Sequence, residues 1–261
     1  MMRSLYIATT GMAAQQMSIE VISNNLANVS TTAFKKSSAE FHELLYQTFR
    51  PAGAPRTSGV LPVGIQVGLG VQPMSAHKTF RQGNFEQTQN DFDIAVEGEG
   101  FFQVTLPDGN TGFTRSGKFE LNNEGAVVNS EGLPLLPAIS VPNGMTHIAI
   151  SPEGVVSGIA AGATIDTILG TMELARFANP AGLESLGKNL FQVTTASGGP
   201  LTGVPGKEGF GKLQQGFLES SNVNIAEEMV KMIVAQRAYE LNSKAIQTSD
   251  EMLSLVNSLK R

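Results

Sequence analysis

Three stretches of the chain place two glycines and a lysine at the spacing of a phosphate-binding loop. They run from Gly112 to Lys118, from Gly182 to Lys188 and from Gly206 to Lys212. Such a loop next requires Ser or Thr to hold magnesium, and it connects a strand to a helix. The following residues here are Phe, Asn and Leu, and no apolar strand leads into a helix at any of the three. We therefore predict no nucleotide site and no cofactor.

Four carboxylates lie within nine residues, at Asp91, Asp93, Glu97 and Glu99. They could bind calcium or act as an acid–base pair. On a strand, all four would project to one face, whereas Phe92, Ile94 and Val96 would project to the other. The pattern therefore predicts a solvated strand face and no catalytic residue. An enzyme acting on peptidoglycan in the periplasm remains the alternative from a different functional class, and these carboxylates are its only candidates.

The remaining reactive residue types give no metal site. His42, His77 and His147 are widely separated, and none belongs to a helical metal-ligand pair. The absence of Cys excludes disulfides and thiolate ligands. A net charge of −5 without a long basic run argues against nucleic acid as a partner. We interpret the longest basic run, Lys35 and Lys36, as a solvated helix end.

An apolar residue returns every seven positions near the N-terminus. Glu20 is the only charged residue between Ser4 and Phe34, and most other positions carry Ser, Thr, Gln or Asn. This pattern predicts a coiled-coil-like helix over about residues 4–28 that is enclosed by other protein segments. Its expected assembly interface consists of Leu5, Met12, Ile19, Ile22 and Leu26.

A second heptad-patterned helix is predicted from about Asn224 to Leu259. Asn224 can cap it, and Glu227 stands at the reciprocal position of a capping box. Two apolar stripes imply neighbours on two sides, so we expect both terminal helices to become fully ordered only on assembly. The interface residues expected on this helix are Val234, Ala238, Leu241, Ala245, Met252, Leu255 and Leu259.

Helix-breaking residues gather in the middle of the chain. All 12 Pro lie between Pro51 and Pro205, and 26 of the 28 Gly lie between Gly53 and Gly211. Turn dipeptides beginning at Asp108, Glu124 and Glu153 separate short alternating runs, which predicts hairpins. The expected fold class is α+β, with the terminal helices forming one domain and an inserted all-β domain that is hairpin-rich and partly barrel-like.

The expected boundaries follow from these patterns. Residues 1–46 and 217–261 form the helical domain, residues 47–82 an extended Gly/Pro-rich connecting segment, and residues 83–216 the β domain. The capping-box spacing of Ser37 and Glu40 predicts a short helix through Leu45. Ile65, Val67, Leu69 and Val71 alternate with polar or glycine residues, which predicts one strand.

The sequence contains no apolar stretch of about 18 residues, so no membrane span is predicted. The apolar run after Arg3 is interrupted by Thr9 and Thr10, unlike the core of a secretory leader. We therefore expect the protein to leave the cytoplasm, if it does so, without a cleaved signal peptide.

Four segments resemble those of bacterial flagellar rod and hook proteins. Residues 23–35, SNNLANVSTTAFK, are similar to the N-terminal signature of that family, and residues 236–244, QRAYELNSK, to its C-terminal signature. Residues 93–104 and 114–117 resemble its central segments. Ala33 stands where the family usually has Gly, so a different turn geometry is expected there. The signature positions are Asn24, Asn25, Asn28, Phe34, Gln236, Arg237, Tyr239 and Asn242.

The resemblance is greatest to the distal-rod branch of this family, and it implies a structural role without enzymatic activity. Copies of the chain would polymerise helically into the drive shaft that links proximal rod to hook and transmits torque. The implied partners are proximal rod proteins, the hook protein, the surrounding peptidoglycan and outer-membrane ring, and the flagellar type III export apparatus. The implied location is the periplasmic rod of the basal body. A proximal rod or hook subunit is the alternative within the family.

Overall fold

The computed structural model describes residues 2–53, 55–56, 59–60, 62–142, 144–160 and 166–258. The chain divides into two compact units. Unit 1 is drawn from three separate segments, which are Met1–Ala27, Ser37–His77 and Asn224–Arg261. Unit 2 comprises Asn28–Lys36 and Lys78–Val223. The architecture is mixed α+β, as the sequence predicted.

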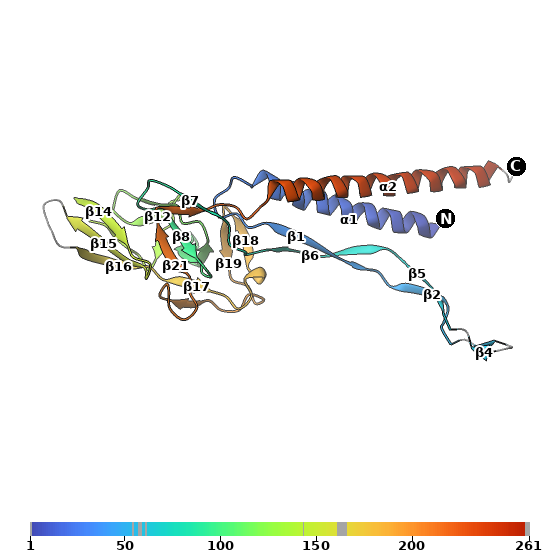
Figure 1. Ribbon diagram of the computed structural model, residues 1–261, viewed down its shortest axis with the longest axis horizontal. Coiled ribbons are helices and arrows are strands. Elements are labelled where there is room, and N and C mark those ends of the chain that lie inside the picture. The colour runs from blue at the N-terminus through green and yellow to red at the C-terminus, as the bar shows by residue number, and fades with distance from the viewer. Residues whose placement is uncertain are drawn as a thin grey trace. The chain divides into compact units, whose positions relative to one another are not determined.

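Unit 1 contains two long helices that lie side by side and antiparallel (Figure 1). They are α1 (Met2–Ala27) and α2 (Ile225–Ser258), so both predicted helices are confirmed. The Asn224 side chain caps α2, because its Oδ1 accepts the backbone N–H of Ala226 at 3.0 Å and of Glu227 at 3.4 Å. Within the described residues, neither helix is long and apolar enough to cross a membrane.

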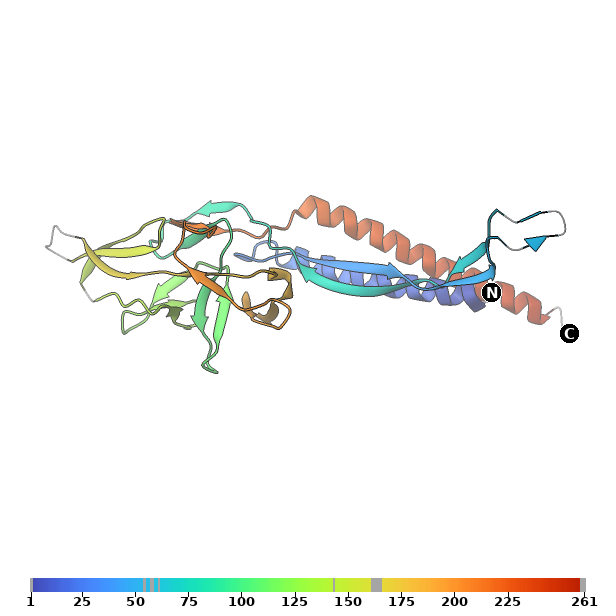
Figure 2. The same ribbon diagram turned by 90° about the horizontal axis from the view of Figure 1, so that it is seen from below.

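Six strands of unit 1 form a two-stranded ribbon, and its β1 strand lies against α1 (Figure 2). β1 pairs with β6, β2 with β5, and β3 with β4. Their bounds are β1 (Ser37–Glu43), β2 (Tyr46–Arg50), β3 (Pro55–Arg56), β4 (Gly59–Val60), β5 (Ile65–Gly68) and β6 (Val71–Lys78).

Two expectations for this ribbon are wrong. The segment from Ser37 that was predicted to be a short helix is strand β1, because its backbone pairs with β6 and with a side chain of α1. The strand predicted over residues 65–71 is interrupted at Gly70, which has φ +121°. A Cβ at Gly70 would lie 2.3 Å from Thr10 Oγ1 of α1, so another residue there would have to displace the Thr10 side chain and also adopt a strained backbone conformation.

Unit 2 is built from small antiparallel sheets. The largest has the strand order β13-β9-β10-β19-β18, and β14, β15 and β16 form a second sheet. The remaining pairs are β11 with β12, β17 with β20, β21 with β8, and β22 with β7. None of these sheets closes on itself in the described part of the chain, so the partly barrel-like arrangement is not confirmed.

The bounds in unit 2 are β7 (Phe85–Gln87), β8 (Ile94–Glu97), β9 (Phe102–Thr105), β10 (Thr111–Thr114), β11 (Phe119–Leu121), β12 (Val127–Asn129), β13 (Leu135–Leu136), β14 (Met145–Ile150), β15 (Val155–Ala160), β16 (Thr167–Thr171), β17 (Leu174–Arg176), the 3₁₀ turn η1 (Pro180–Gly182), β18 (Glu184–Gly187), β19 (Leu190–Gln192), β20 (Leu201–Gly203), β21 (Lys212–Gln215) and β22 (Phe217–Glu219). The three predicted hairpins are confirmed as β9–β10, β11–β12 and β14–β15.

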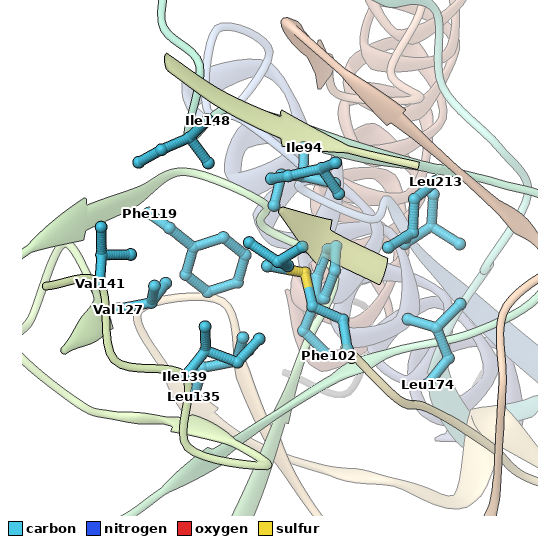
Figure 3. Packing of buried hydrophobic residues seen from close by; sticks show 14 residues of the cluster. Ile94, Phe102, Phe119, Val127, Leu135, Ile139, Val141, Ile148, Leu174 and Leu213 are labelled. Carbon is cyan, nitrogen blue, oxygen red and sulfur yellow. The ribbon is translucent and has the colours of Figure 1, made fainter. Parts of the chain in front are cut away.

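Two hydrophobic clusters stabilise unit 2. In the larger one, Phe102 and Phe119 meet edge to face at 5.1 Å among buried aliphatic side chains (Figure 3). In the second, the ring of Phe101 lies 5.4 Å from Phe80 and 5.7 Å from Phe177. Phe80 and Phe101 of the second cluster also line a small pocket together with Lys35 and Arg115, two of the charged residues described next.

Candidate functional site

Unit 2 buries three charged side chains in one cluster. The Glu219 carboxylate accepts hydrogen bonds from Lys35 Nζ at 2.6 Å and from Arg115 Nε at 2.7 Å. All three residues are almost fully excluded from solvent. We call this group the charge cluster. Its members come from the segment after α1, the segment after β10 and the end of β22, which are far apart in the sequence.

Backbone groups satisfy the remaining hydrogen-bonding capacity of the charge cluster. The Arg115 guanidinium donates to the carbonyls of Val96 at 2.8 Å, of Gly98 at 2.5 Å and of Gly100. Glu219 Oε1 also accepts the Gly83 N–H at 2.7 Å. Lys35 Nζ donates to the Arg81 carbonyl at 2.9 Å. The charges therefore connect strand β8 at Val96 with the loop positions Arg81, Gly83, Gly98 and Gly100.

The surroundings in the charge cluster shift the pKa values of Lys35 and Glu219. Burial lowers the pKa of the Lys35 ammonium below its ordinary value, and Glu219 opposes this effect only in part. Burial alone would raise the pKa of the Glu219 carboxyl. Arg115 and Lys35 outweigh it, so that the pKa of Glu219 lies below its ordinary value. Glu219 is therefore ionised at neutral pH and serves as the anion at the centre of the cluster.

Asn222 connects two of the chain segments that contribute to the charge cluster, the one after Lys35 and the one around Arg81. Its Oδ1 accepts the Lys36 N–H at 2.8 Å, and its Nδ2 donates to the carbonyls of Thr79 at 2.8 Å and Arg81 at 3.0 Å. Ala33, which lies in the same segment as Lys36, has φ +57° and is 1% exposed. Alanine thus adopts the left-handed conformation that usually requires glycine, at a cost of about 1 kcal/mol.

The structure corrects two interpretations of charged residues. Lys35 was expected at a solvated helix end, but it is buried in the charge cluster. Asp93 was expected on a solvated strand face, but it is 4% exposed and accepts a hydrogen bond from Asn90 Nδ2 at 3.1 Å. Strand β8 begins only at Ile94, so Asp91 and Asp93 precede it. The described residues contain no cluster of three metal-ligating side chains.

Unit 1 has a smaller buried polar site around Asn25, at the C-terminal end of α1. The Asn25 side chain accepts the Ser37 N–H at 2.9 Å and donates to the Ser37 carbonyl at 2.9 Å. It also donates to the Glu228 carboxylate of α2 at 3.1 Å. One side chain therefore pairs with β1 as a neighbouring strand would and links α1 to α2.

At other points along their length, α1 and α2 contact each other through small residues. A Cβ at Gly11 of α1 would lie 2.9 Å from the Asn242 side chain of α2. Ala8, Ala14 and Ala235 are buried in the same unit. The fully buried residues of α2 are Glu228, Ala235 and Ser249, and Met232, Ile246 and Leu253 are partly buried. Most of the interface residues expected on α2 are instead exposed.

The structure separates the two expected assembly sets. On α1, Ile22 is buried, and Leu5, Met12, Ile19 and Leu26 are partly buried within unit 1. On α2, Ala238 is partly buried and Ala245 is exposed, whereas Val234, Leu241, Met252 and Leu255 are 63%, 66%, 51% and 63% exposed. Leu259 lies outside the described residues. The α1 set therefore contributes to unit 1 itself, and most of the α2 set faces away from it.

Comparison with known proteins places this architecture in one family. Residues 5–35 match the family described as flagella basal body rod protein, residues 95–158 the flagellar hook protein FlgE/F/G D1 domain, and residues 214–259 the flagellar basal body rod FlgEFG protein C-terminal. The flagellar basal-body rod protein FlgG of Buchnera aphidicola subsp. Acyrthosiphon pisum is 50% identical over 260 residues, which cover 99% of this chain and 100% of that protein. The chain belongs to the flagellar basal-body rod protein family.

Two further relatives of the rod family cover the chain almost completely. FlgG of Borreliella burgdorferi is 50% identical over 269 residues, with full coverage of both proteins. FlgG of Agrobacterium fabrum is 45% identical over 258 residues, with 98% of both proteins covered. The family is structural, which agrees with the interpretation of the carboxylates as non-catalytic.

The rod-family signature residues occupy three kinds of position in this structure. Asn25 and Phe34 are buried, and Asn28 and Asn242 are partly buried. Asn24, Gln236, Arg237 and Tyr239 are exposed. Sequence reasoning missed Arg115 and Glu219 as members of a site. Arg115 could have been found, since it lies within the resembling segment 114–117, whereas Glu219 lies outside the four segments that carried the resemblance.

Proposed function

We propose that this chain is a structural subunit of the bacterial flagellar distal rod. Copies of it polymerise helically into the shaft that links proximal rod to hook and transmits torque. The proposal is supported by full-length relatives named as flagellar basal-body rod proteins, at 43–50% identity for several of them. It is also supported by a unit that combines two long antiparallel helices, which suit the wall of a stiff tube.

The observation that carries the polymerisation step is the apolar face that α2 leaves exposed. Val230, Val234, Leu241 and Leu255 are each more than 60% exposed, although α2 already packs on α1. A contiguous exposed apolar stripe on a helix marks an interaction surface. We assign it to neighbouring copies, whose head-to-tail contacts produce a filament because they do not close into a ring. The helices would then act as a coiled-coil-like layer.

The terminal helices become ordered on assembly, and the assembled rod lies outside the cytoplasm. In the dilute monomer, the terminal helices lack the neighbours that cover the α2 stripe, so they are less protected than unit 2 and become fully ordered on assembly. The assembled rod lies in the periplasm, which the chain reaches through the flagellar export apparatus. There it contacts proximal rod proteins, the hook protein and the surrounding ring.

Substitution on the exposed stripe tests the proposal. Leu241→Asp places a charge where the neighbouring copy would lie, whereas Gln247→Asp introduces the same charge at an exposed polar position of α2. We expect the wild-type protein and Gln247→Asp to form tubes at high concentration, as seen by electron microscopy, and Leu241→Asp to remain monomeric with unchanged circular dichroism. Tubes of normal yield from Leu241→Asp would contradict the assignment of this face.

A further inference from the structure

A polar pocket of about 280 Å³ lies in unit 2, near the end of β10. Its wall is formed by the segment after α1, by the segment that follows β10, by the β12–β13 connection and by the β18–β19 turn. Every lining residue is polar, and none is aromatic. Saccharides and nucleobases usually stack on aromatic rings, so this composition favours a small anionic group as the occupant.

The charges of the pocket favour a carboxylate. Lys188 Nζ donates to the Glu131 carboxylate at the rim, so those two charges offset each other. Lys118 is exposed, and no ion pair involves its ammonium in the described part of the chain. Ser116 and Ser130 add hydroxyl donors to the wall. The pocket thus offers one uncompensated cation surrounded by hydrogen-bond donors, which is complementary to one carboxylate.

An exposed carboxylate lies next to the opposite end of strand β10. β10 runs from Thr111, next to the β9–β10 turn, to Thr114, which lines the pocket. The turn carries Asp108, which is exposed, and Gly109, around which a Cβ would meet no atom within 4 Å. Figure 2 shows this green hairpin projecting from the rest of unit 2. Asp108 therefore stands in open solvent on a narrow tip.

We propose that the pocket receives the Asp108 carboxylate of a second copy of this chain, with Lys118 as its counter-ion. This inference rests on the proposed polymerisation. Head-to-tail contacts need two different complementary patches on each subunit, and an anionic tip at one end of β10 with a cationic pocket at the other end meets that requirement. The contact joins outer β units, and it is separate from the apolar stripe on α2. It sets the register between copies, because charge pairing penalises misplaced contacts.

The Cys-free chain allows a direct test by crosslinking. Asp108→Cys and Lys118→Cys are combined in cells whose rods are built from this chain, and isolated basal bodies are treated with a short bis-maleimide. A spacer is needed because the Cα atoms of a Lys–Asp ion pair lie farther apart than the roughly 7 Å limit for a disulfide. We expect a ladder of dimers and higher multimers, and no ladder from either single variant or from the control pair Asp166→Cys with Lys207→Cys.

Charge exchange gives an independent readout. We expect Lys118→Glu and Asp108→Lys each to lower the yield of assembled rods roughly tenfold, and the double exchange to restore most of it. Lys207→Glu and Asp166→Lys, which make the same changes at other exposed positions, should have no effect. Intact rods without a specific ladder, or single exchanges that leave the yield unchanged, would overturn the inference and leave the proposed function standing. A wild-type chain that builds no rod at all would instead refute the proposed function.

Discussion

Glu219→Gln should destabilise unit 2 by at least about 3 kcal/mol. The substitution keeps the shape of the side chain but removes the only anion of the charge cluster, so Lys35 and Arg115 remain buried next to each other without a counter-charge. Breaking a buried ion pair by removing one partner costs about 3–5 kcal/mol. Since domains of this kind unfold at a cost of about 5–15 kcal/mol, the change is a large part of the total.

The measurement must distinguish the two units. All three tyrosines, Tyr6, Tyr46 and Tyr239, belong to unit 1, and the chain has no Trp. Tyrosine fluorescence therefore follows unit 1, whereas hydrogen exchange of the β9 amides follows unit 2. We expect urea to expose the β9 amides at much lower concentration in the Glu219→Gln variant, and Glu120→Gln, at an exposed position, to behave as wild type.

The reasoning is refuted if Glu219→Gln lowers the free energy of unfolding of unit 2 by less than about 1 kcal/mol. An apolar replacement of all three charges is not expected to rescue the variant. Arg115 also donates to three carbonyls, and an apolar side chain would leave those carbonyls buried without donors.

Three further predictions concern pH, helix contact and the polar site of unit 1. The pKa of Glu219 in the folded protein is below its ordinary value of 4.5, so Glu219 contributes its full share to the free energy of unfolding above pH 4.5. This contribution is lost as the pH falls through the lower folded-state pKa. Urea titrations at pH 7 and pH 3 should therefore show that the wild-type protein exceeds Glu219→Gln in stability by less at pH 3. Gly11→Ala should not raise the stability of unit 1 by the roughly 1 kcal/mol expected from helix propensity, because its Cβ would contact the Asn242 side chain. Adding Asn242→Ala should restore that gain in stability, measured by unfolding followed through tyrosine fluorescence. Asn25→Ala should cost about 2–3 kcal/mol and accelerate exchange of the Ser37 amide, since it removes both hydrogen bonds to that residue.

The long helices were predictable from sequence because their signals are local. Asn224 caps α2 as expected, and the apolar repeat of α1 needs only its own spacing to be recognised. The prediction of a short helix from Ser37 was wrong because contacts with distant parts of the chain decide the structure of this segment. Its capping-box spacing was real, but Asn25 and β6 offer the Ser37 backbone better partners. Alternate exposure along β1 follows the period of two that was present in the sequence.

The buried positions of α2 could be inferred only in part from the apolar pattern. Met232, Ile246 and Leu253 are partly buried, as apolar residues should be, but Glu228, Asn242 and Ser249 are buried or partly buried as well, and an amphipathic interpretation assigns those three to solvent. Close approach at Gly11 and the hydrogen bond to Asn25 make those residues suitable for burial. The charge cluster was missed for a similar reason, because its two ion pairs join residues that are far apart in the sequence: Lys35 and Glu219 are 184 positions apart, and Arg115 and Glu219 are 104 apart.

The discontinuous make-up of unit 1 imposes an order on folding. Its first helix, α1, precedes both segments of unit 2 in the sequence, and the helix on which it packs, α2, follows them. Any process that delivers the polypeptide from its N-terminal side leaves α1 without that partner until the 197 residues from 28 to 224 have followed it, since α1 ends at Ala27 and α2 begins at Ile225. Unit 2, whose segments are all present by Val223, can close earlier. Unit 1 can therefore complete its folding only after α2 has followed the rest of the chain.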